Sequence, residues 1–417
     1  MSGMSYGLRR HATSGVLHVR RIVILGGGYA GVRVAQEILR HMDDGELVLI
    51  DRGHYHEIVT EMYRVAAGAE EPKGVQLPLR RLLPQKPQLT MLQAEVQSLD
   101  VREREVHTDR GRVPYRYLVL ALGGAPEYYG VQGAKEYALT LQYLDSAVRV
   151  RRRLRSLTAS KGGGRIVIVG GGLTGVELAS EISEHTQGTF DIAIVQAAPT
   201  ILPEEDKRLA SYAQSELEKH HITVYRGVPV AEVHAHSVKL KSGADLPSDV
   251  TIWAGGVRAN PIAKEAGLPC DQRGRVLVDA QLEVEGHPGI FAAGDIAHVP
   301  SGHSQGALPP TAQLAVQEGL QVGRNILRVL KDEEPQPLHA RILGTAAALG
   351  DRHGIAHIGR FRLTGRAGHV MHELALLRYL YGAGGLGLLR REAYLSWTRP
   401  PQEHVAQSPS SKAGTSA

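Results

Sequence analysis

The sequence predicts an α/β fold that contains two similar β-α-β units with parallel strands. In the first unit, the apolar runs Arg21–Leu25 and Leu47–Ile50 flank a stretch with helical periodicity. In the second unit, Arg165–Val169 and Ile192–Val195 flank a similar stretch. Strands that alternate with helices are typical of parallel sheets. Further apolar runs predict buried strands at Tyr117–Leu122, Thr251–Ala254 and Gly289–Ala293.

A glycine-rich turn follows the first strand of each unit and opens its helix. The pattern G-x-G-x-x-G occupies Gly26–Gly31 and recurs 144 residues later at Gly170–Gly175. Its glycines allow a tight turn, a close approach of the backbone to a pyrophosphate, and close packing of helix on strand. The helix N-terminus adds free N–H groups and the positive end of a dipole. The two units therefore predict two Rossmann-like dinucleotide-binding domains.

The bare glycine pattern is not specific, because a third match lacks the structural context of the first two. Gly382, Gly384 and Gly387 also fit it, but no strand precedes them. We interpret this stretch as a bend in the chain.

Polar residues stand where the last strand of each unit ends. Asp51 lies 20 residues after Gly31, where a carboxylate can bind the hydroxyls of a ribose. Gln196 holds the corresponding place in the second unit, and its neutral amide repels a 2′-phosphate less than a carboxylate does. Gly294 and Asp295 follow another apolar run, where the carboxylate can accept a hydrogen bond from a sugar or ribityl hydroxyl. NADH is the expected ligand of the second unit, and NADPH is the alternative.

Composition narrows the class of protein. The 417 residues suffice for two or three domains, and the Lys and Arg behind the formal charge of +5 are spread along the chain, which does not favour nucleic-acid binding. The single cysteine, Cys270, excludes an internal disulfide and a redox-active cysteine pair within one chain. Residues 1–20 lack the apolar core of a signal peptide, and no run reaches the roughly 18 apolar residues of a membrane span. We expect a cytoplasmic protein, or one bound to the cytoplasmic face of the membrane, without a metal site.

The order of these motifs resembles the two-dinucleotide-binding flavoprotein family, which includes the pyridine nucleotide–disulfide oxidoreductases. In that order, a glycine motif for FAD is followed by one for NAD(P)H and then by Gly289–Asp295 (G-I-F-A-A-G-D). Within the family, the chain resembles the type II NADH:quinone oxidoreductases, which are single-subunit dehydrogenases that pump no protons. The stretches that carry this resemblance are Tyr55–Glu61 with Ala66–Gly68, Trp253–Arg258 (W-A-G-G-V-R), Ala312–Gln317 (A-Q-L-A-V-Q) and Gly344–Gly350.

The resemblance implies bound FAD, NADH as the electron donor, and a membrane quinone (menaquinone or ubiquinone) as the acceptor. Two positions depart from the family pattern: Gln196 replaces a glutamate, so NADPH stays an alternative, and His372 stands where several relatives carry a lysine. The implied cofactor-binding residues are Gly26, Gly28, Ala30, Gly31, Asp51, Arg52, Thr60, Ala121, Gly123, Gly170, Gly172, Thr174, Gly175, Gln196, Gly255, Gly256, Gly294, Asp295, Ala312 and Gln313.

Three residues are implied to act in catalysis. Gln313 and Gln317 lie four residues apart on a helix predicted from about Thr311, so they share one face, and the resemblance implies that they border the quinone. The alternative is an amphipathic helix with two solvated amides. Glu177 is implied to lie near the flavin and nicotinamide and to relay a proton to the quinone. Its alternative role is to stabilise the N-terminus of its helix.

The C-terminal region is expected to lie in a membrane interface. Apolar residues recur at helical spacing between Arg366 and Tyr381, and leucines, aromatic residues and arginines mix from Leu388 to Arg399. The alternative is a dimer interface or a packed domain edge, and both can hold, so a homodimer is also expected.

These expectations divide the chain into five parts. Residues 1–20 form a flexible leader, and residues 398–417 form a disordered tail. A discontinuous FAD-binding domain takes residues 21–140 and 287–337, and it encloses an NAD(P)H-binding domain at 141–286. Residues 338–397 form a C-terminal domain for membrane association, dimerisation or both.

Two other functions remain open at this stage. One is a soluble NAD(P)H reductase that serves a protein acceptor such as a ferredoxin. The other is a flavoprotein that binds NADH, turns over slowly and acts through an interaction.

Overall fold

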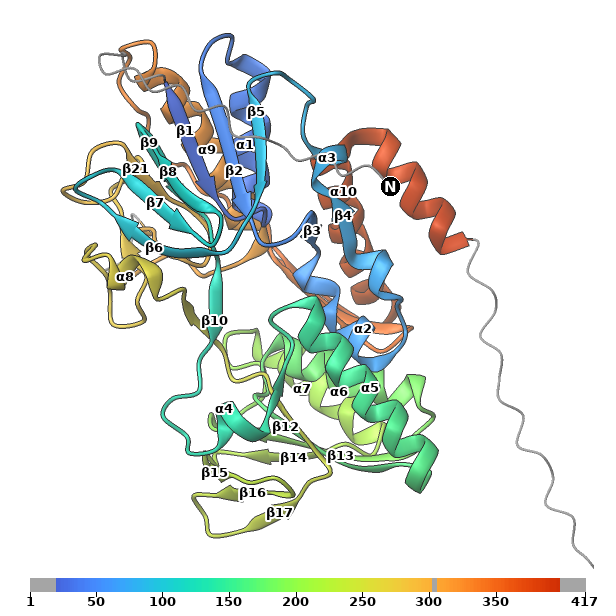
Figure 1. The fold of residues 1–417 in the computed structure, drawn as a ribbon. Coiled ribbons are helices and arrows are strands. Elements are labelled where there is room, and N and C mark those ends of the chain that lie inside the picture. The colour runs from blue at the N-terminus through green and yellow to red at the C-terminus, as the bar shows by residue number, and fades with distance from the viewer. Residues whose placement is uncertain (1–19, 302–305, 398–417) are drawn as a thin grey trace, which may run out of the picture.

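The structure is a computed structural model, and it describes residues 20–301 and 306–397 (Figure 1). The expected tail at 398–417 and all but the last residue of the expected leader lie outside the described residues.

The first large sheet is parallel, with the strand order β21-β9-β1-β2-β5 (Figure 1). Its central strand β1 leads into the first glycine motif, and Ile22–Leu25 of that strand are fully buried. Strands buried on both faces read as continuous apolar runs, which is why the sequence shows no alternation here. The strands are β1 (Arg21–Leu25), β2 (Glu46–Asp51), β5 (Leu89–Gln93), β9 (Tyr117–Leu120) and β21 (Ile290–Ala292).

Two helices that are far apart in the sequence pack on this sheet together. Helix α1, Tyr29–His41, follows β1 directly, and α9, Ala312–Val329, lies along it. Gly319 of α9 sits against the backbone of Ala30, where an added Cβ would lie 2.3 Å from the Ala30 carbonyl oxygen. The first sheet is therefore completed by residues beyond position 289.

The second large sheet repeats the architecture of the first. It is parallel, with the order β11-β18-β12-β13-β14, and the strand that leads into the second glycine motif is again central. The duplication predicted from the glycine motifs is confirmed. The strands are β11 (Leu139–Thr140), β12 (Gly164–Val169), β13 (Phe190–Gln196), β14 (Thr223–Arg226) and β18 (Val250–Trp253), and the helices are α5 (Leu144–Lys161), α6 (Leu173–His185) and α7 (Lys207–Lys219).

The C-terminal part consists of an antiparallel sheet and a long bent helix. The sheet order is β23 (Thr345–Leu349), β24 (His353–Ile358) and β25 (Phe361–Thr364). Helix α10, Gly365–Trp397, contains one non-helical residue, Gly385, at φ 67° and ψ −163°. The bend predicted around residues 382–387 is thus confirmed. No helix among the described residues is long and apolar enough to cross a membrane.

Short elements complete the fold. The antiparallel pair β10 (Gly124–Pro126) and β19 (Val257–Ala259) joins the regions of the two large sheets. The remaining elements are β3 (Tyr55–Glu57), β4 (Gln76–Pro78), β6 (Val96–Asp100), β7 (Glu105–Thr108), β8 (Gly111–Pro114), β15 (Val230–Val233), β16 (Ser237–Leu240), β17 (Asp245–Pro247), β20 (Val276–Leu277), β22 (Ala297–His298), α2 (Met62–Ala67), α3 (Leu79–Leu82), α4 (Ala134–Tyr137), α8 (Ile262–Glu265), and the 3₁₀ turns at Val59–Glu61 and Pro72–Val75.

Candidate functional site

The outer glycines of each motif are required by the fold itself. Gly26 has φ 103°, and a Cβ there would lie 2.3 Å from the carbonyl oxygen of Ala121. A Cβ on Gly31 would lie 1.9 Å from the Gly26 oxygen. The second motif repeats these contacts, because Cβ atoms on Gly170 and Gly175 would meet Ala254 O at 2.3 Å and Gly170 O at 1.9 Å.

The middle glycines, Gly28 and Gly172, are not required by the fold. Each precedes its helix as the N-cap, with φ of −76° and −77°, which any residue can adopt. A Cβ at either position would meet nothing within 4 Å. The open space lies in front of a helix N-terminus that no side chain caps. Both loops therefore fit a bound pyrophosphate, which needs this close approach to the backbone.

The residues at the ends of β2 and β13 hold their glycine loops in place. Asp51 accepts hydrogen bonds from Gly27 N and Gly53 N, both at 2.7 Å. Gln196 accepts one from Gly171 N at 3.0 Å, so its side chain takes the same position as Asp51 without a negative charge. Arg226 of β14 is the register partner of Gln196 and is exposed. Gln196 and Arg226 place no carboxylate at this edge, which suits either nicotinamide cofactor.

The carboxylate of Asp295 lies beside the first glycine loop. Among the described residues, nothing forms a hydrogen bond or ion pair with it, and burial raises its pKa. Its neighbour Gly294 lies against α1 and α9, since a Cβ there would be 3.6 Å from those of both Ala30 and Ala315. A half-buried acceptor of this kind is normally satisfied, and the hydroxyl of a bound cofactor would satisfy it.

Glu318 of α9 supports this loop, although it belongs to none of the sequence motifs. Its Oε2 accepts a hydrogen bond of 2.6 Å from Gly294 N. Burial raises the pKa of the 4%-exposed Glu318 to about 7. Glu318 lies on the apolar face of an amphipathic helix, where an acidic residue is unexpected. That unusual position is the one sequence signal for a functional role of Glu318.

We predict that Glu318→Gln weakens the pH dependence of stability. The folded protein holds the Glu318 proton more tightly than the unfolded chain, so its unfolding free energy falls as the pH rises from 4.5 to about 7. This loss is on the order of 3 kcal/mol, and Gln, which can still accept from Gly294 N, removes it. Urea unfolding of both proteins below and above this interval tests the prediction, and parallel pH dependences would contradict it.

The other predicted cofactor-binding residues lie around the two loops in different environments. Thr60 Oγ1 is 3.3 Å from the Tyr29 hydroxyl, and the Arg52 guanidinium lies 4.0 Å from the centre of the Tyr143 ring. Gly255 lies against Gly170, because a Cβ added to Gly170 would be 2.9 Å from Gly255 N. Of the rest, Ala30 and Ala121 are buried, Thr174 is exposed at the start of α6, Ala312 opens α9, and Gly123 and Gly256 have φ of 68° and 126°.

The amides of Gln313 and Gln317 are bound to the backbone that leads into β23. Gln313 donates to Gly344 O at 2.9 Å and accepts from Leu343 N at 3.1 Å. Gln317 donates to Arg341 O and accepts from Arg341 N, at 3.0 and 2.9 Å. The predicted shared face is confirmed, but the amides are not the solvated groups of the alternative interpretation. They tether α9 to the C-terminal sheet.

Glu177 lies at the centre of a buried cluster drawn from three parts of the chain. Its Oε1 accepts a hydrogen bond of 3.2 Å from Ala348 N of β23 and lies 3.6 Å from His372 Nε2 of α10. Glu61, just before α2, lies 4.0 Å from the same histidine nitrogen. Gly344 contacts Gln313, and Ala348, four residues later, contacts Glu177. An extended segment of this length spans roughly 13 Å.

Burial and mutual charge set the protonation of this cluster. Burial raises the pKa of Glu177 to about 8. Burial lowers the pKa of His372, but the surrounding carboxylates of Glu373, Glu177 and Glu61 outweigh it and raise that pKa to about 9. A carboxyl group that holds its proton near neutral pH beside a cationic histidine can donate and recover a proton.

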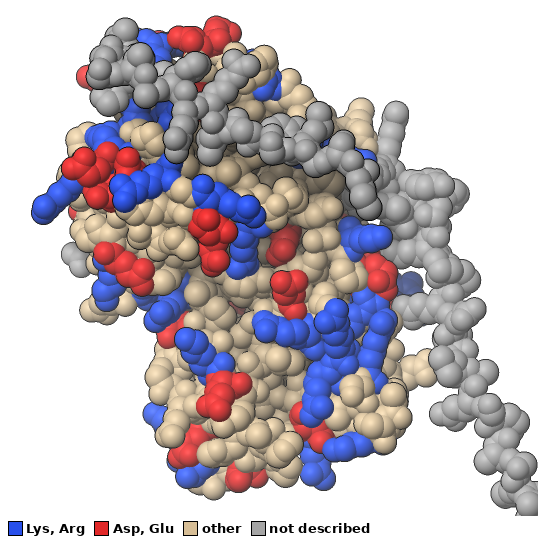
Figure 2. All heavy atoms as spheres, viewed as in Figure 1, with Lys and Arg blue, Asp and Glu red and all other residues tan. Residues whose placement is uncertain are grey.

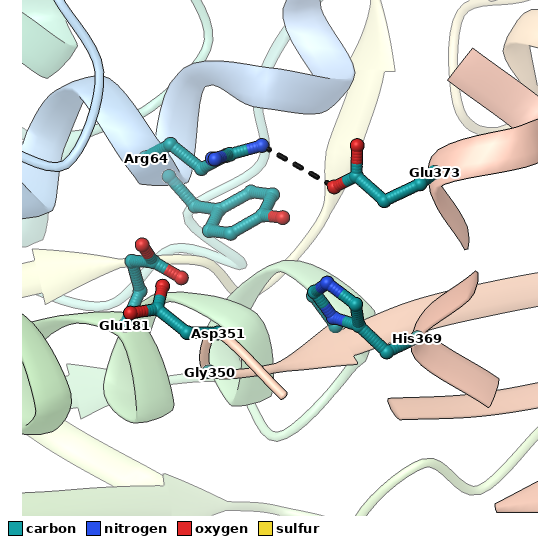
Figure 3. A pocket seen from close by; sticks show the side chains of 8 residues that line it. Arg64, Glu181, Gly350, Asp351, His369 and Glu373 are labelled. Carbon is teal, nitrogen blue, oxygen red and sulfur yellow. Dashed lines mark hydrogen bonds and ion pairs between the residues drawn. The ribbon is translucent and has the colours of Figure 1, made fainter. Parts of the chain in front are cut away.

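A cavity of about 120 Å³, partly open to solvent, lies next to this cluster. Figure 3 shows the side chains that line it. Glu181 lines it, one helical turn after Glu177, and burial raises its pKa to about 7. Arg64 and Glu373 line it too, with 3.4 Å between Arg64 Nη1 and Glu373 Oε1. Its remaining lining residues are Tyr63, Ala348, Gly350, Asp351 and His369. The spacing of four from Glu177 was the available sequence signal for Glu181.

His56 connects the first glycine loop to the C-terminal helix. It has no exposed surface, its Nδ1 lies 3.0 Å from Gly27 O, and its Nε2 lies 2.6 Å from the Tyr379 hydroxyl of α10. Burial lowers the pKa of His56 to about 4, so the ring is neutral near pH 7. Tyr29 packs on both rings, with centroids 4.8 and 4.7 Å away.

The described residues contain no group of three or more metal-ligating side chains suited to a metal ion. The lone Cys270 is partly buried, and the isolated bridge it forms pairs it with Val276.

Comparison with known proteins agrees with this geometry. The family model described as pyridine nucleotide-disulphide oxidoreductase matches residues 20–319. A type II NADH:quinone oxidoreductase of Staphylococcus haemolyticus is 27% identical over 393 residues, which cover 88% of this chain and 97% of that protein. The Staphylococcus aureus protein of the same name shows the same identity and coverage. The resemblance drawn from the motifs is thus confirmed.

The solved structures that align with the chain share its fold. NDH2 from Plasmodium falciparum in complex with NADH has a TM-score of 0.82 at 17% identity, covering 92% of this chain and 99% of that chain. The sulfide:quinone oxidoreductase of Aquifex aeolicus has a TM-score of 0.75 at 18% identity, covering 91% and 95%. The predicted α/β architecture with two Rossmann-like units is confirmed.

Proposed function

The chain belongs to the pyridine nucleotide-disulphide oxidoreductase family, and from this premise we propose that it is a flavoenzyme that oxidises NADH and reduces a membrane quinone. The observation that carries the proposal is that one backbone segment, residues 343–349, contacts both Gln313 and Glu177. Gln313 bonds to residues 343 and 344 just before β23, Glu177 accepts from Ala348 of β23, and Glu177 belongs to the helix that follows the second glycine loop. The type II relatives carry this activity in their name.

A single cysteine separates this function from others in the family. Electron transfer through a cysteine pair needs two cysteines near the flavin, and the chain has only Cys270. The single cysteine also argues against oxidation of sulfide, although the fold resembles that of the sulfide:quinone oxidoreductase from Aquifex aeolicus. Electrons therefore leave for a diffusing acceptor.

FAD would be held by the first glycine loop, by Asp51 and by Asp295, and NAD(P)H by the second loop and Gln196. Bound flavin supplies hydride acceptance and electron transfer, for which the protein provides position rather than an acid or base. Helix α9 begins at Ala312 behind the Thr311 cap, and its N-terminal dipole would stabilise negative charge on a group placed before it. Ala312 leaves room at that end of the helix.

Glu177 would deliver protons to the quinone, and Glu181 would resupply it from the open cavity. Reduction of a quinone by NADH takes up one proton from solvent per turnover, so a route for protons is needed. Glu177 is 8% exposed, whereas the cavity lined by Glu181 opens to solvent. His372 takes the place of a lysine and would hold positive charge beside Glu177 by the same electrostatic effect.

The C-terminal part would bind the enzyme to the membrane. Val370, Leu374, Leu377 and Tyr381 of α10 are all exposed and lie on one helical face. The enzyme would then be peripheral on the cytoplasmic face, pump no protons and form a homodimer, with the domain boundaries expected from the sequence.

Anaerobic flavin spectroscopy tests the proposed function. NADH should bleach the flavin absorbance of the purified protein quickly, and a soluble ubiquinone or menaquinone analogue should restore it quickly. Bleaching without recovery would leave both nucleotide sites standing and would point to a protein acceptor such as a ferredoxin. Recovery with quinone no faster than with oxygen would point to a slow flavoprotein with an interaction role.

We predict that Gln196→Glu makes the enzyme reject NADPH. The new carboxylate can still accept from Gly171 N, but it would repel a 2′-phosphate. The kcat/KM for NADPH should fall about 10-fold relative to that for NADH, which corresponds to about 1.4 kcal/mol. Steady-state kinetics with one acceptor and both donors measure the ratio, and an unchanged ratio would place the 2′-position away from Gln196.

A further inference from the structure

A second open cavity, which we call the arginine groove, lies outside the candidate site. Its volume is about 530 Å³, and none of the predicted site residues lines it. Helix α1 contributes Arg33, Gln36 and Arg40, α3 and the residues after it contribute Arg81–Pro84, and the bend of α10 contributes Tyr381–Gly385. Figure 1 shows α3 and α10 side by side at this edge of the molecule.

The groove gathers positive charge that the described residues neutralise only in part. No acidic residue lines it, and within the described part of the chain neither Arg33 nor Arg81 forms an ion pair. Arg33 donates only to the neutral Gln36 Oε1 at 3.2 Å, while Arg40 reaches Glu37 at 4.0 Å. Partial burial and the positive charge of Arg40 lower the pKa of Arg33. An anion in the groove would relieve this repulsion.

A buried glutamine fixes the shape of the groove. Gln36 is 1% exposed, and its Nε2 donates to Leu82 O at 2.8 Å and to Ala383 O at 2.6 Å. One side chain thus joins α1, α3 and α10 under the arginines. The groove is therefore a built feature rather than a chance gathering of mobile surface side chains.

An exposed apolar stripe runs along α10 into the groove. Its members Val370, Leu374, Leu377 and Tyr381 are 53%, 46%, 38% and 55% exposed. They recur at helical spacing, so they share one face. Tyr381 belongs both to the stripe and to the lining of the groove, which places apolar and cationic surfaces next to each other.

Resting on the membrane association proposed above for α10, we propose that the arginine groove binds the headgroup phosphate of an anionic phospholipid whose acyl chains cover the α10 stripe. Guanidinium groups match the geometry of a phosphate, and leucine and tyrosine side chains suit the boundary between headgroups and acyl chains. A free phosphate would leave the stripe in water. The ends of the chain are poor occupants, because residues 1–19 contain no Asp or Glu and residues 398–417 contain only Glu403.

Vesicle co-sedimentation of the flavin-loaded protein tests the proposal. Wild-type protein should bind phosphatidylglycerol-containing vesicles more tightly than pure phosphatidylcholine vesicles. Arg33→Gln combined with Arg81→Gln should weaken binding to the anionic vesicles about 30-fold, since each basic residue near such a surface is worth about 1 kcal/mol. The double variant should keep its flavin absorbance and its bleaching by NADH, which shows that it is folded.

A matched double variant separates the groove from general positive charge. Figure 2 shows basic side chains gathered over α5, and Arg152→Gln with Arg155→Gln removes two exposed charges there. This variant should bind anionic vesicles within about 3-fold of wild type. An equal loss in both variants, or equal binding of the wild type to both vesicle types, would overturn the proposal. Displacement by inorganic phosphate at matched ionic strength would reassign the groove to a free anion.

Discussion

Gly28→Val is expected to give a folded protein without FAD, whereas Gly172→Val should keep its FAD and lose its use of NADH. Both positions have ordinary backbone angles and open space around a new side chain, so the protein alone tolerates the change. A pyrophosphate that approaches the helix N-terminus does not tolerate it. For Gly172→Val, the KM for NADH should rise about 100-fold or more, because small displacements of a bound donor cost this much.

The two glycine variants control for each other. Flavin absorbance after gel filtration reports FAD retention, circular dichroism reports folding, and the rate of bleaching by NADH reports the second site. Gly31→Val is a useful contrast, because its Cβ would lie 1.9 Å from Gly26 O and should disrupt the protein itself. If Gly28→Val and Gly172→Val both bind FAD and react with NADH normally, the two loops do not hold dinucleotides.

Glu177→Gln is expected to slow reoxidation of the flavin by quinone about 100-fold while leaving its reduction by NADH unchanged. A glutamine at position 177 can still accept the hydrogen bond from Ala348 N, so the substitution mainly removes the ionisable proton of the carboxyl group. In the wild type, quinone reduction should fall as the pH rises through about 8, because the buried Glu177 carboxyl then loses its proton. The variant should lack this transition. Stopped-flow measurement of both half-reactions across this range tests the prediction.

A buried acid outside the cluster provides the control for Glu177→Gln. Glu216 of α7 is 2% exposed, and its ion pairs among the described residues are with Lys219 and His353 rather than with members of the Glu177 cluster. Glu216→Gln should leave both half-reactions and the pH profile unchanged. Slower reduction by NADH in Glu177→Gln would assign Glu177 to the nicotinamide site, and an unchanged reoxidation rate would remove it from proton transfer.

The nucleotide loops could be predicted from sequence because their chemistry is local. A strand, three glycines and a helix N-terminus follow one another within one short segment, and Asp51 ends the next strand of the same unit. The helix that carries Gln313 and Gln317 was also local, so its shared face was predicted. The backbone partners of the two amides were not, because residues 341–344 reach them from beyond the end of α9.

The acid cluster could not be read from the sequence for a different reason. Glu61, Glu177 and His372 come from segments separated by more than a hundred residues, and each alone looks like an ordinary polar position. His56 and Tyr379 meet across an even longer separation. Local periodicity does not predict such long-range tertiary contacts. Only the family resemblance indicated Glu177 and His372.

The late position of β21 has a consequence for folding during synthesis. The second sheet uses strands between Leu139 and Trp253 and is complete once these have left the ribosome. The first sheet must wait for β21 and α9, and the His56 contact must wait for Tyr379. Its early strands therefore remain exposed while the inserted unit folds. The motif translated second should be structured first, and flavin loading should be among the last steps of biogenesis.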